Sequence, residues 1–202
     1  MEKLIAFLLF QLITLLPLTA QTAKQVLDKT AAVVAAKSGV QANFSIKGSN
    51  SVSLNTSGKI AVKGRKFHAT TPQATIWFDG KTMWTYMKQN DEVNVSNPTE
   101  AQLAAINPYN FIYMYKNGYS SSLEKADNSY YVHLQATDKK KNIQEMHIMV
   151  KQKSYIPWKI TYRTAKGVVS IDISNFKATS LSDGTFRFNS KDFPKAEIID
   201  LR

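Results

Sequence analysis

The sequence predicts a mainly β fold with a few helices, in the α+β class, and three observations support this. Short runs of alternating apolar and polar residues recur from residue 40 onward, separated by turns rich in Gly, Asn, Asp and Lys. The stretch before them, residues 22–37, has helical spacing instead. Two proline-containing stretches, near residues 97 and 107, carry helix-start signals in the middle of the strand pattern.

The first twenty residues have the pattern of a secretory signal peptide. A short charged start precedes the apolar run 4–18, and Ala20 closes it. The run is short for a bilayer span and Pro17 interrupts it, so we expect cleavage near Ala20 rather than a retained anchor. The chain has no cysteine, and Gln21 stands where a lipoprotein would carry its lipidated cysteine. We therefore expect a soluble exported protein without lipid or disulfide.

The first helix is expected from Thr22 to Lys37. Thr22 and Gln25 match a capping box, and Gly39 is placed to end the helix in the left-handed conformation. The apolar stripe expected on this helix consists of Val26, Leu27, Thr30, Val33 and Val34. This stripe must lie against another layer, which is most simply the sheet that follows.

The rest of the chain predicts antiparallel strands joined by short turns. The expected strands are 40–47, 52–63, 66–70, the hairpin 74–87, 92–96, 129–137, 143–152, 156–164, 168–176 and 186–189. Gly58 indicates a bulge within the second strand. Since no linker or repeat interrupts the pattern, residues 21–202 are expected to form a single domain.

The most informative stretch is the hairpin 74–87, in which β-branched and aromatic residues flank Asp79-Gly80. Asp-Gly favours a two-residue type I′ turn, which would pair Ile76 with Met83. One face of the hairpin then carries Ala74, Ile76, Phe78, Met83 and Met87, and the other carries Trp77, Trp84 and Tyr86. Because both faces are apolar, either both are covered or one lines an apolar pocket.

Two short helices are expected between the strand groups. Asn97-Pro98-Thr99-Glu100 matches a capping box with proline at the first helical position. Asn107-Pro108 starts the next helix, with Ile106 and Phe111 as a hydrophobic staple, and Gly118 ends it. This second helix is very apolar, so it is expected to pack on the sheet, or to fill a cavity and move aside.

Composition and motifs favour binding over catalysis. The net charge of +11 on an exported chain favours acidic partner proteins or anionic lipid head groups over nucleic acid, although dispersed lysines that aid solubility explain it equally well. His68, His133 and His147 each lie alone on a predicted strand, and no nucleophile elbow or phosphate loop is found. We therefore expect neither an enzyme nor a cofactor or metal. Methionines at 83, 87, 114, 146 and 149 suit either a mobile apolar ligand or ordinary core filling.

The order of these segments resembles the periplasmic lipoprotein carrier family of the LolA type over essentially the whole mature chain. The strongest match is Phe78-Asp79-Gly80-Lys81-Thr82-Met83-Trp84, similar to the family's Asp-Gly-Lys-Thr-Leu-Trp hairpin. Weaker similarities are found at Asn43–Ser45, Gly58–Lys63, Pro108–Met114 and from Phe186 to Asp200.

This resemblance implies an incomplete, strongly curved antiparallel β-barrel with helices packed in its concave face. It also implies a soluble, monomeric periplasmic carrier that shields lipoprotein acyl chains from water. Its implied partners are an inner-membrane lipoprotein-releasing transporter and, where one exists, an outer-membrane acceptor. The acceptor of the same fold is itself a lipoprotein, so the absence of cysteine favours a carrier. The alternative is a lipid- or lipoprotein-binding sensor module of the same fold that does not shuttle cargo.

The ligand site expected from these arguments has two parts. The hairpin face and the apolar helix would form the cavity wall, through Ile76, Phe78, Met83, Met87, Phe111, Ile112 and Tyr115. The resemblance implies an arginine and an aromatic residue at the cavity mouth, and Arg65 and Phe67 occupy the matching positions. A basic turn beside a core phenylalanine is the simpler interpretation of that pair.

Overall fold

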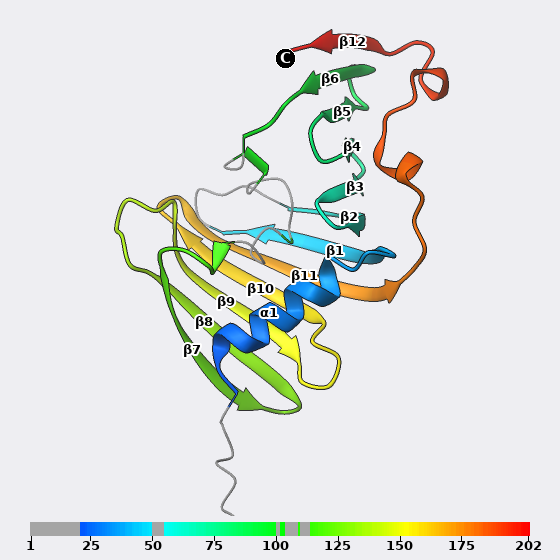
Figure 1. Cartoon of the computed structure of the whole chain (residues 1–202). Coiled ribbons are helices and arrows are strands. Elements are labelled where there is room, and N and C mark those ends of the chain that lie inside the picture. Colours follow the sequence, from blue (N-terminus) through cyan, green and yellow to red (C-terminus); the bar gives the residue numbers. More distant parts are fainter. Residues whose placement is uncertain (1–20, 50–54, 100–101, 104–108, 110–113) are drawn as a thin grey trace, which may run out of the picture.

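The computed structural model describes residues 21–49, 55–99, 102–103, 109 and 114–202 (Figure 1). Its first half contains α1 (Ala23–Val34), β1 (Val40–Gly48), β2 (Asn55–Lys63), β3 (Lys66–Thr70), β4 (Ala74–Phe78), β5 (Met83–Met87) and β6 (Glu92–Ser96). The second half contains β7 (Tyr119–Ala126), β8 (Ser129–Ala136), β9 (Ile143–Lys151), β10 (Pro157–Thr164), β11 (Gly167–Ala178), the 3₁₀ turns η1 (Asp183–Phe186) and η2 (Ser190–Asp192), and β12 (Glu197–Asp200).

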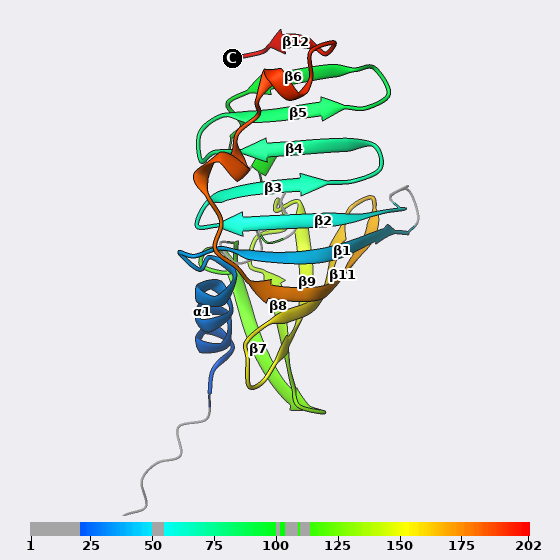
Figure 2. The same ribbon diagram turned by 90° about the vertical axis from the view of Figure 1, so that its right-hand side faces the viewer.

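The strands form one open twelve-stranded sheet in the order β12-β6-β5-β4-β3-β2-β1-β11-β10-β9-β8-β7. All neighbouring pairs are antiparallel except β12 and β6, which are parallel. The sheet is strongly twisted, since β1–β6 run across the view of Figure 2 while β7–β9 run nearly upright. The mainly β prediction is therefore confirmed, as an open curved sheet with one described α-helix.

Two connections cross the sheet on opposite faces. Residues 97–118 lead from β6 to the far edge strand β7, and three of their described side chains, Leu103, Tyr109 and Tyr115, are buried in the same core cluster as α1. We call the face of the sheet in this cluster the inner face. Residues 179–196 return from β11 to β12 along the opposite, outer face, where Leu181 and Phe186 pack on Ala61.

The helix α1 begins as the sequence predicts and ends earlier. The Thr22 hydroxyl accepts from the Gln25 amide at 3.2 Å, and the Gln25 side chain accepts from the Thr22 amide at 2.9 Å, so the capping box is present. The helix ends at Val34, and Gly39 adopts its φ of +109° in a further turn beyond the helix. The expected stripe is largely buried, through Val26, Leu27, Thr30 and Val34, and it lies nearest β7 and β8.

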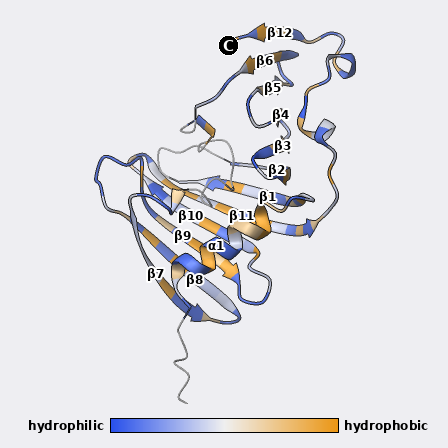
Figure 3. Cartoon of the chain, viewed as in Figure 1, coloured by the Kyte–Doolittle hydropathy of each residue, from blue (hydrophilic) through white to orange (hydrophobic). Residues whose placement is uncertain are grey.

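The hydropathy of the strand residues alternates between the two faces of the sheet. Hydrophobic and hydrophilic residues alternate along the strands behind α1 (Figure 3), as expected for a sheet with two differently covered faces. On β8 and β9, the inner-face residues Val132, Leu134, Met146 and Ile148 are buried in the core. Among the described residues, no helix is long and apolar enough to cross a membrane.

One strand was not predicted, and one predicted strand is wrong. Residues 119–126 form β7, which the sequence did not reveal because this edge strand is largely exposed and polar and therefore lacks apolar alternation. Residues 186–189 were expected as a strand, but the chain there leaves η1 and continues across the outer face. The strand at this end of the chain is β12, which pairs with β6.

Gly58 does not form the expected bulge. The pairing of β1 with β2 continues through Gly58 without a shift, and the irregularity lies between β1 and β11, at Gln41–Asn43. Gly58 is instead a site of close approach, because a Cβ there would overlap the Thr70 carbonyl oxygen and lie 2.9 Å from Phe44 Cζ.

The capping box after β6 is shifted by two residues from its predicted position. Thr99, rather than Asn97, caps the turn: its amide donates to Gln102 Oε1 at 2.8 Å, and its hydroxyl accepts from the Gln102 amide at 3.3 Å. The Asn97 side chain instead accepts from the Thr82 hydroxyl at 3.2 Å. The expected helix start at Asn107-Pro108 and the staple of Ile106 with Phe111 lie outside the described residues.

Candidate functional site on the inner face of the sheet

The hairpin of β4 and β5 turns through a longer loop than predicted. Asp79 Oδ1 accepts from the amides of Lys81 and Thr82 at 3.0 and 2.9 Å, and the Asp79 amide donates to the Thr82 carbonyl at 3.2 Å. Phe78 consequently pairs with Met83, two residues from the predicted register. A shift of two residues keeps every side chain on its face, so the predicted division into two faces still describes the hairpin.

The inner face of this hairpin is apolar and closely packed. Phe78 and Met83 are buried in the main core, and Ile76 packs against it. Phe67 on β3 lies beside Phe78 with ring centroids 5.5 Å apart and planes tilted by 37°. These four side chains form one apolar surface across β3, β4 and β5, which we call the inner-face cluster.

Three described residues of the connection 97–118 are buried in the same core. Leu103, Tyr109 and Tyr115 all belong to it. The Tyr115 hydroxyl donates to Asp28 Oδ1 on α1 at 2.5 Å, which ties the connection to the helix. Burial, and then this hydrogen bond to a carboxylate, raise the pKa of the Tyr115 hydroxyl, so it remains a donor.

Of the other predicted site residues, the structure describes Met87, Arg65 and Phe67. Met87 lies at the open end of β5 and is 36% exposed. Phe111 and Ile112 lie outside the described residues, so their contact with a ligand stays a prediction. Arg65 is exposed in the turn between β2 and β3, whereas Phe67 is only 1% exposed. Phe67 is therefore buried in the core, and its contact with a ligand, like that of Arg65, stays a prediction.

Three basic residues gather at the turn that carries Arg65. The ammonium groups of Lys63 and Lys66 lie 3.1 and 2.9 Å from the Asp183 carboxylate in η1. These contacts, first that with Lys66 and then that with Lys63, hold the pKa of Asp183 below its usual value. The pairs fix the C-terminal connection to this end of β2 and β3, and Arg65 is exposed between the two lysines.

The outer face of the hairpin is covered by aromatic residues that the sequence analysis did not select. Phe188 and Phe193 each contact Trp77 edge-on, with centroids 5.6 Å away, and Phe193 also lies 4.6 Å from Tyr86. The sequence has three phenylalanines within eight residues, at 186, 188 and 193. This pattern fits a segment that packs over a sheet face as well as it fits a strand. Both faces of the hairpin are apolar because both are covered.

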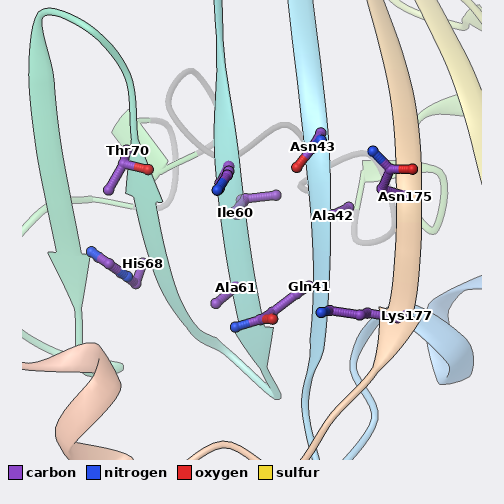
Figure 4. A pocket seen from close by; sticks show the side chains of 10 residues that line it. Gln41, Ala42, Asn43, Ile60, Ala61, His68, Thr70, Asn175 and Lys177 are labelled. Atoms are coloured by element: carbon purple, nitrogen blue, oxygen red, sulfur yellow. The ribbon is translucent and has the colours of Figure 1, made fainter.

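The outer face also has a polar hollow of about 470 Å³ between β1, β2, β3 and β11 (Figure 4). Its wall includes Asn43, Lys59, His68, Asn175 and Lys177. Two lysines and several amides make this hollow unsuitable for acyl chains. Burial lowers the pKa of His68, whose ring stacks on Trp77 with centroids 5.4 Å apart.

The expectation that the three histidines are isolated is wrong for two of them. His133 and His147 are directly paired across β8 and β9, and their rings stack with centroids 4.6 Å apart. The sequence did contain the information that pairs these two histidines. The predicted hairpin turn at Asp138–Asn142 is centred on residue 140, and such a turn places residue 133 opposite residue 147.

The comparisons with known proteins identify the family. The family model described as outer membrane lipoprotein carrier protein LolA matches residues 13–166. The chain belongs to the LolA family. The match includes the inner-face cluster and ends before β11, so the covering segment on the outer face lies beyond it. No curated protein matches the sequence.

Solved structures are similar to this LolA-family chain at low identity, and the first of those described next shares its fold. An uncharacterized conserved protein from Thermus thermophilus is 12% identical and has a TM-score of 0.62, covering 88% of this chain and 98% of its own. A LolA superfamily protein from Nitrosomonas europaea is 16% identical with a TM-score of 0.46, covering 84% and 99%. LprF from Mycobacterium bovis is 11% identical with a TM-score of 0.43, covering 79% and 94%.

Proposed function

We propose that this LolA-family protein is a periplasmic carrier that holds lipoprotein acyl chains against the inner-face cluster and moves lipoproteins from the inner to the outer membrane. The observation that carries the proposal is the apolar surface of Phe67, Ile76, Phe78 and Met83 in a chain that matches the lipoprotein carrier model. A carrier needs such a surface because each acyl methylene removed from water contributes about 0.8 kcal/mol.

The parts of the chain that pack on the inner face support an acyl site at the β4–β5 hairpin. The helix α1 lies nearest β7 and β8, at the other end of the sheet from the hairpin. The described side chains Leu103 and Tyr109 of the connection 97–118 are buried in the same core cluster as Phe67, Phe78 and Met83. An acyl chain that binds there replaces contacts made by the protein itself. This competition lowers the net affinity and makes release to an acceptor possible.

Photo-crosslinking tests which face meets the acyl chain. A photoreactive amino acid is placed at Met83 in one variant and at Trp84 in another. The two positions are adjacent on β5 and lie on opposite faces. With a diacylated lipopeptide, we expect at least fivefold more crosslinking at position 83, and little at either position with the same peptide lacking acyl chains. Equal labelling, or stronger labelling at position 84, would contradict the inner-face site.

A transfer assay separates a carrier from a binding module that keeps its cargo. Arg65 is placed to meet an acidic partner surface because it is exposed in the turn between β2 and β3. We expect Arg65→Leu to slow lipoprotein transfer to outer-membrane vesicles several-fold while acyl binding stays unchanged. The matched control is Lys166→Leu, which removes one positive charge from the turn between β10 and β11. Since β1 pairs Val40 with Val62 and Gly48 with Val169, this turn lies at the opposite end of β1.

The outcomes of the two assays are distinct. Acyl binding at position 83 without any transfer by the unmodified protein would favour the sensor or binding module. Transfer that is unaffected by Arg65→Leu would remove this residue from the carrier mechanism and leave the acyl site intact.

A further inference from the structure

His133 on β8 and His147 on β9 lie opposite each other on the outer face of the sheet. Their residues are direct cross-strand partners, and their rings are nearly parallel, with an interplanar angle of 9°. Their neighbours in sequence, Val132 and Ile148, point to the other face and are buried in the core. The two imidazoles are therefore held in place by the pairing of two strands that each have a neighbour on both sides, while their side chains remain 37% and 46% exposed.

Glu145 supplies a third ligand atom beside the two rings. It precedes His147 by two residues on β9 and so shares its face. Glu145 Oε1 lies 3.1 Å from His133 Nε2 and 3.4 Å from His147 Nε2, and all three atoms lie within 4.8 Å of one another. The other carboxylate oxygen, Oε2, lies 3.2 Å from Arg163 Nε on β10. Arg163 thus orients the carboxylate so that Oε1 faces the imidazoles.

We propose that His133, Glu145 and His147 form a binding site for a divalent transition metal of the zinc class. Zinc binds imidazole nitrogen and carboxylate oxygen at about 2.0–2.2 Å in a tetrahedron, whose ligand atoms are therefore about 3.3 Å apart. The two distances from Glu145 Oε1, 3.1 and 3.4 Å, already have this length. Rotation of the two half-exposed rings about their Cβ–Cγ bonds aims both Nε2 atoms at one ion.

The surroundings leave the fourth position of the tetrahedron open. A hollow of about 230 Å³, lined in part by Ser122, Glu124 and Tyr131, lies beside the two histidines. It gives room for a water molecule or a ligand atom from another molecule to complete the coordination. The site lies on the outer face and does not depend on the acyl site, so the failure of either proposal leaves the other standing.

The donor set determines which ions the site selects. Two imidazoles and one carboxylate suit zinc, copper and nickel, whereas calcium and magnesium prefer shells made of oxygen atoms. Carboxylate ligands usually need a hydrogen-bond partner that fixes their orientation, and Arg163 is that partner because it holds the oxygen that does not face the metal.

Zinc titration of the untagged protein, after removal of metals by a chelator, tests the site. Competition with a chromogenic zinc indicator gives the stoichiometry and the affinity. We expect one zinc ion per chain, and no displacement of that zinc by a hundredfold excess of magnesium or calcium. His133→Gln and His147→Gln should each weaken zinc binding at least tenfold. The matched control is His68→Gln, which removes the only other histidine of the chain, located on β3, and should leave zinc binding unchanged.

A second measurement guards against variants that fold poorly. In the unmodified protein, one equivalent of zinc should shift the imidazole ¹⁵N resonances of His133 and His147 and leave those of His68 in place. Glu145→Gln should weaken zinc binding while the strand pairing, followed by backbone amide resonances, is preserved. The proposal is overturned if the double variant His133→Gln/His147→Gln binds zinc as tightly as the unmodified protein, or if zinc shifts no histidine resonance.

Discussion

Gly58 on β2 occupies a position that admits no side chain. A Cβ there would overlap the Thr70 carbonyl oxygen on β3 and lie 2.9 Å from Phe44 Cζ on β1. The first of these is backbone within a paired strand, which cannot turn aside as a long side chain can. The absence of a side chain at Gly58 therefore allows three neighbouring strands to pack closely. Glycine is needed here for space and not for its backbone conformation, because Gly58 is not among the glycines with positive φ.

We expect Gly58→Ala to lower the free energy of unfolding by about 2 kcal/mol or more, because the added methyl must displace backbone in a packed region. Urea unfolding followed by circular dichroism measures this. Gly184→Ala is the control, since a Cβ at Gly184 meets its nearest neighbour, Ser182 Oγ, at 3.7 Å. That control should stay within about 0.5 kcal/mol of the unmodified protein. Equal stability of the two variants would show that β2 and β3 can separate freely.

At the scale of elements, the outer face of β4 and β5 depends on the C-terminal segment. Phe188 and Phe193 pack on Trp77 and Tyr86, and the segment ends in β12, which pairs in parallel with β6. Without this segment, an apolar sheet face and the edge of β6 would both meet water. A single segment thus covers one face and replaces β6 as the edge strand by β12, which has only four residues. Short edge strands are less open to pairing with a second molecule.

Phe193→Ala tests this cover. We expect it to destabilise the protein by about 1–3 kcal/mol through lost aromatic packing, and to shift tryptophan emission to longer wavelength as Trp77 meets water. Leu201→Ala is the control, because Leu201 is 62% exposed and should change neither signal. A Phe193→Ala variant with unchanged emission would mean that Phe188 alone covers Trp77.

At the scale of the whole molecule, the Tyr115–Asp28 hydrogen bond joins parts of the chain 87 residues apart. Asp28 also lies 2.8 Å from the Lys24 ammonium. The contacts with Lys24 and then Tyr115 hold the pKa of Asp28 below its usual value. A carboxyl with a lowered folded-state pKa stabilises the protein above its unfolded pKa of about 4, and this contribution is lost as the pH falls through the folded-state pKa.

We therefore expect Tyr115→Phe to cost about 1–2 kcal/mol at pH 7, where the acceptor is charged, and clearly less once the pH falls below the lowered folded-state pKa of Asp28. Tyr119→Phe is the matched control, because the Tyr119 hydroxyl donates to the uncharged Ile143 carbonyl at 3.0 Å. Its cost should not vary over the same pH range. Urea unfolding at several pH values measures both variants, and a pH-independent cost for Tyr115→Phe would exclude Asp28 as its charged partner.

The sequence alone determined the local structure of this protein. Period-two alternation marked β1, β3, β6 and most of the later strands, and Thr22 with Gln25 marked the start of α1, because these signals depend on neighbours within a few residues. It also determined which hairpin side chains share a face, since even a register error of two residues leaves the faces unchanged. The polar edge strand β7 gave no such signal.

Only the tertiary structure decided how distant segments meet. Side chains from two connections pack on opposite faces of the sheet: Leu103, Tyr109 and Tyr115 share the core with Phe67 on one face, and Phe193 lies over Trp77 on the other. The same long-range pairing brought His133, Glu145 and His147 into one cluster. Such contacts depend on where each connection crosses the sheet and on how much apolar surface it buries there. A residue's immediate neighbours in sequence carry little information about either.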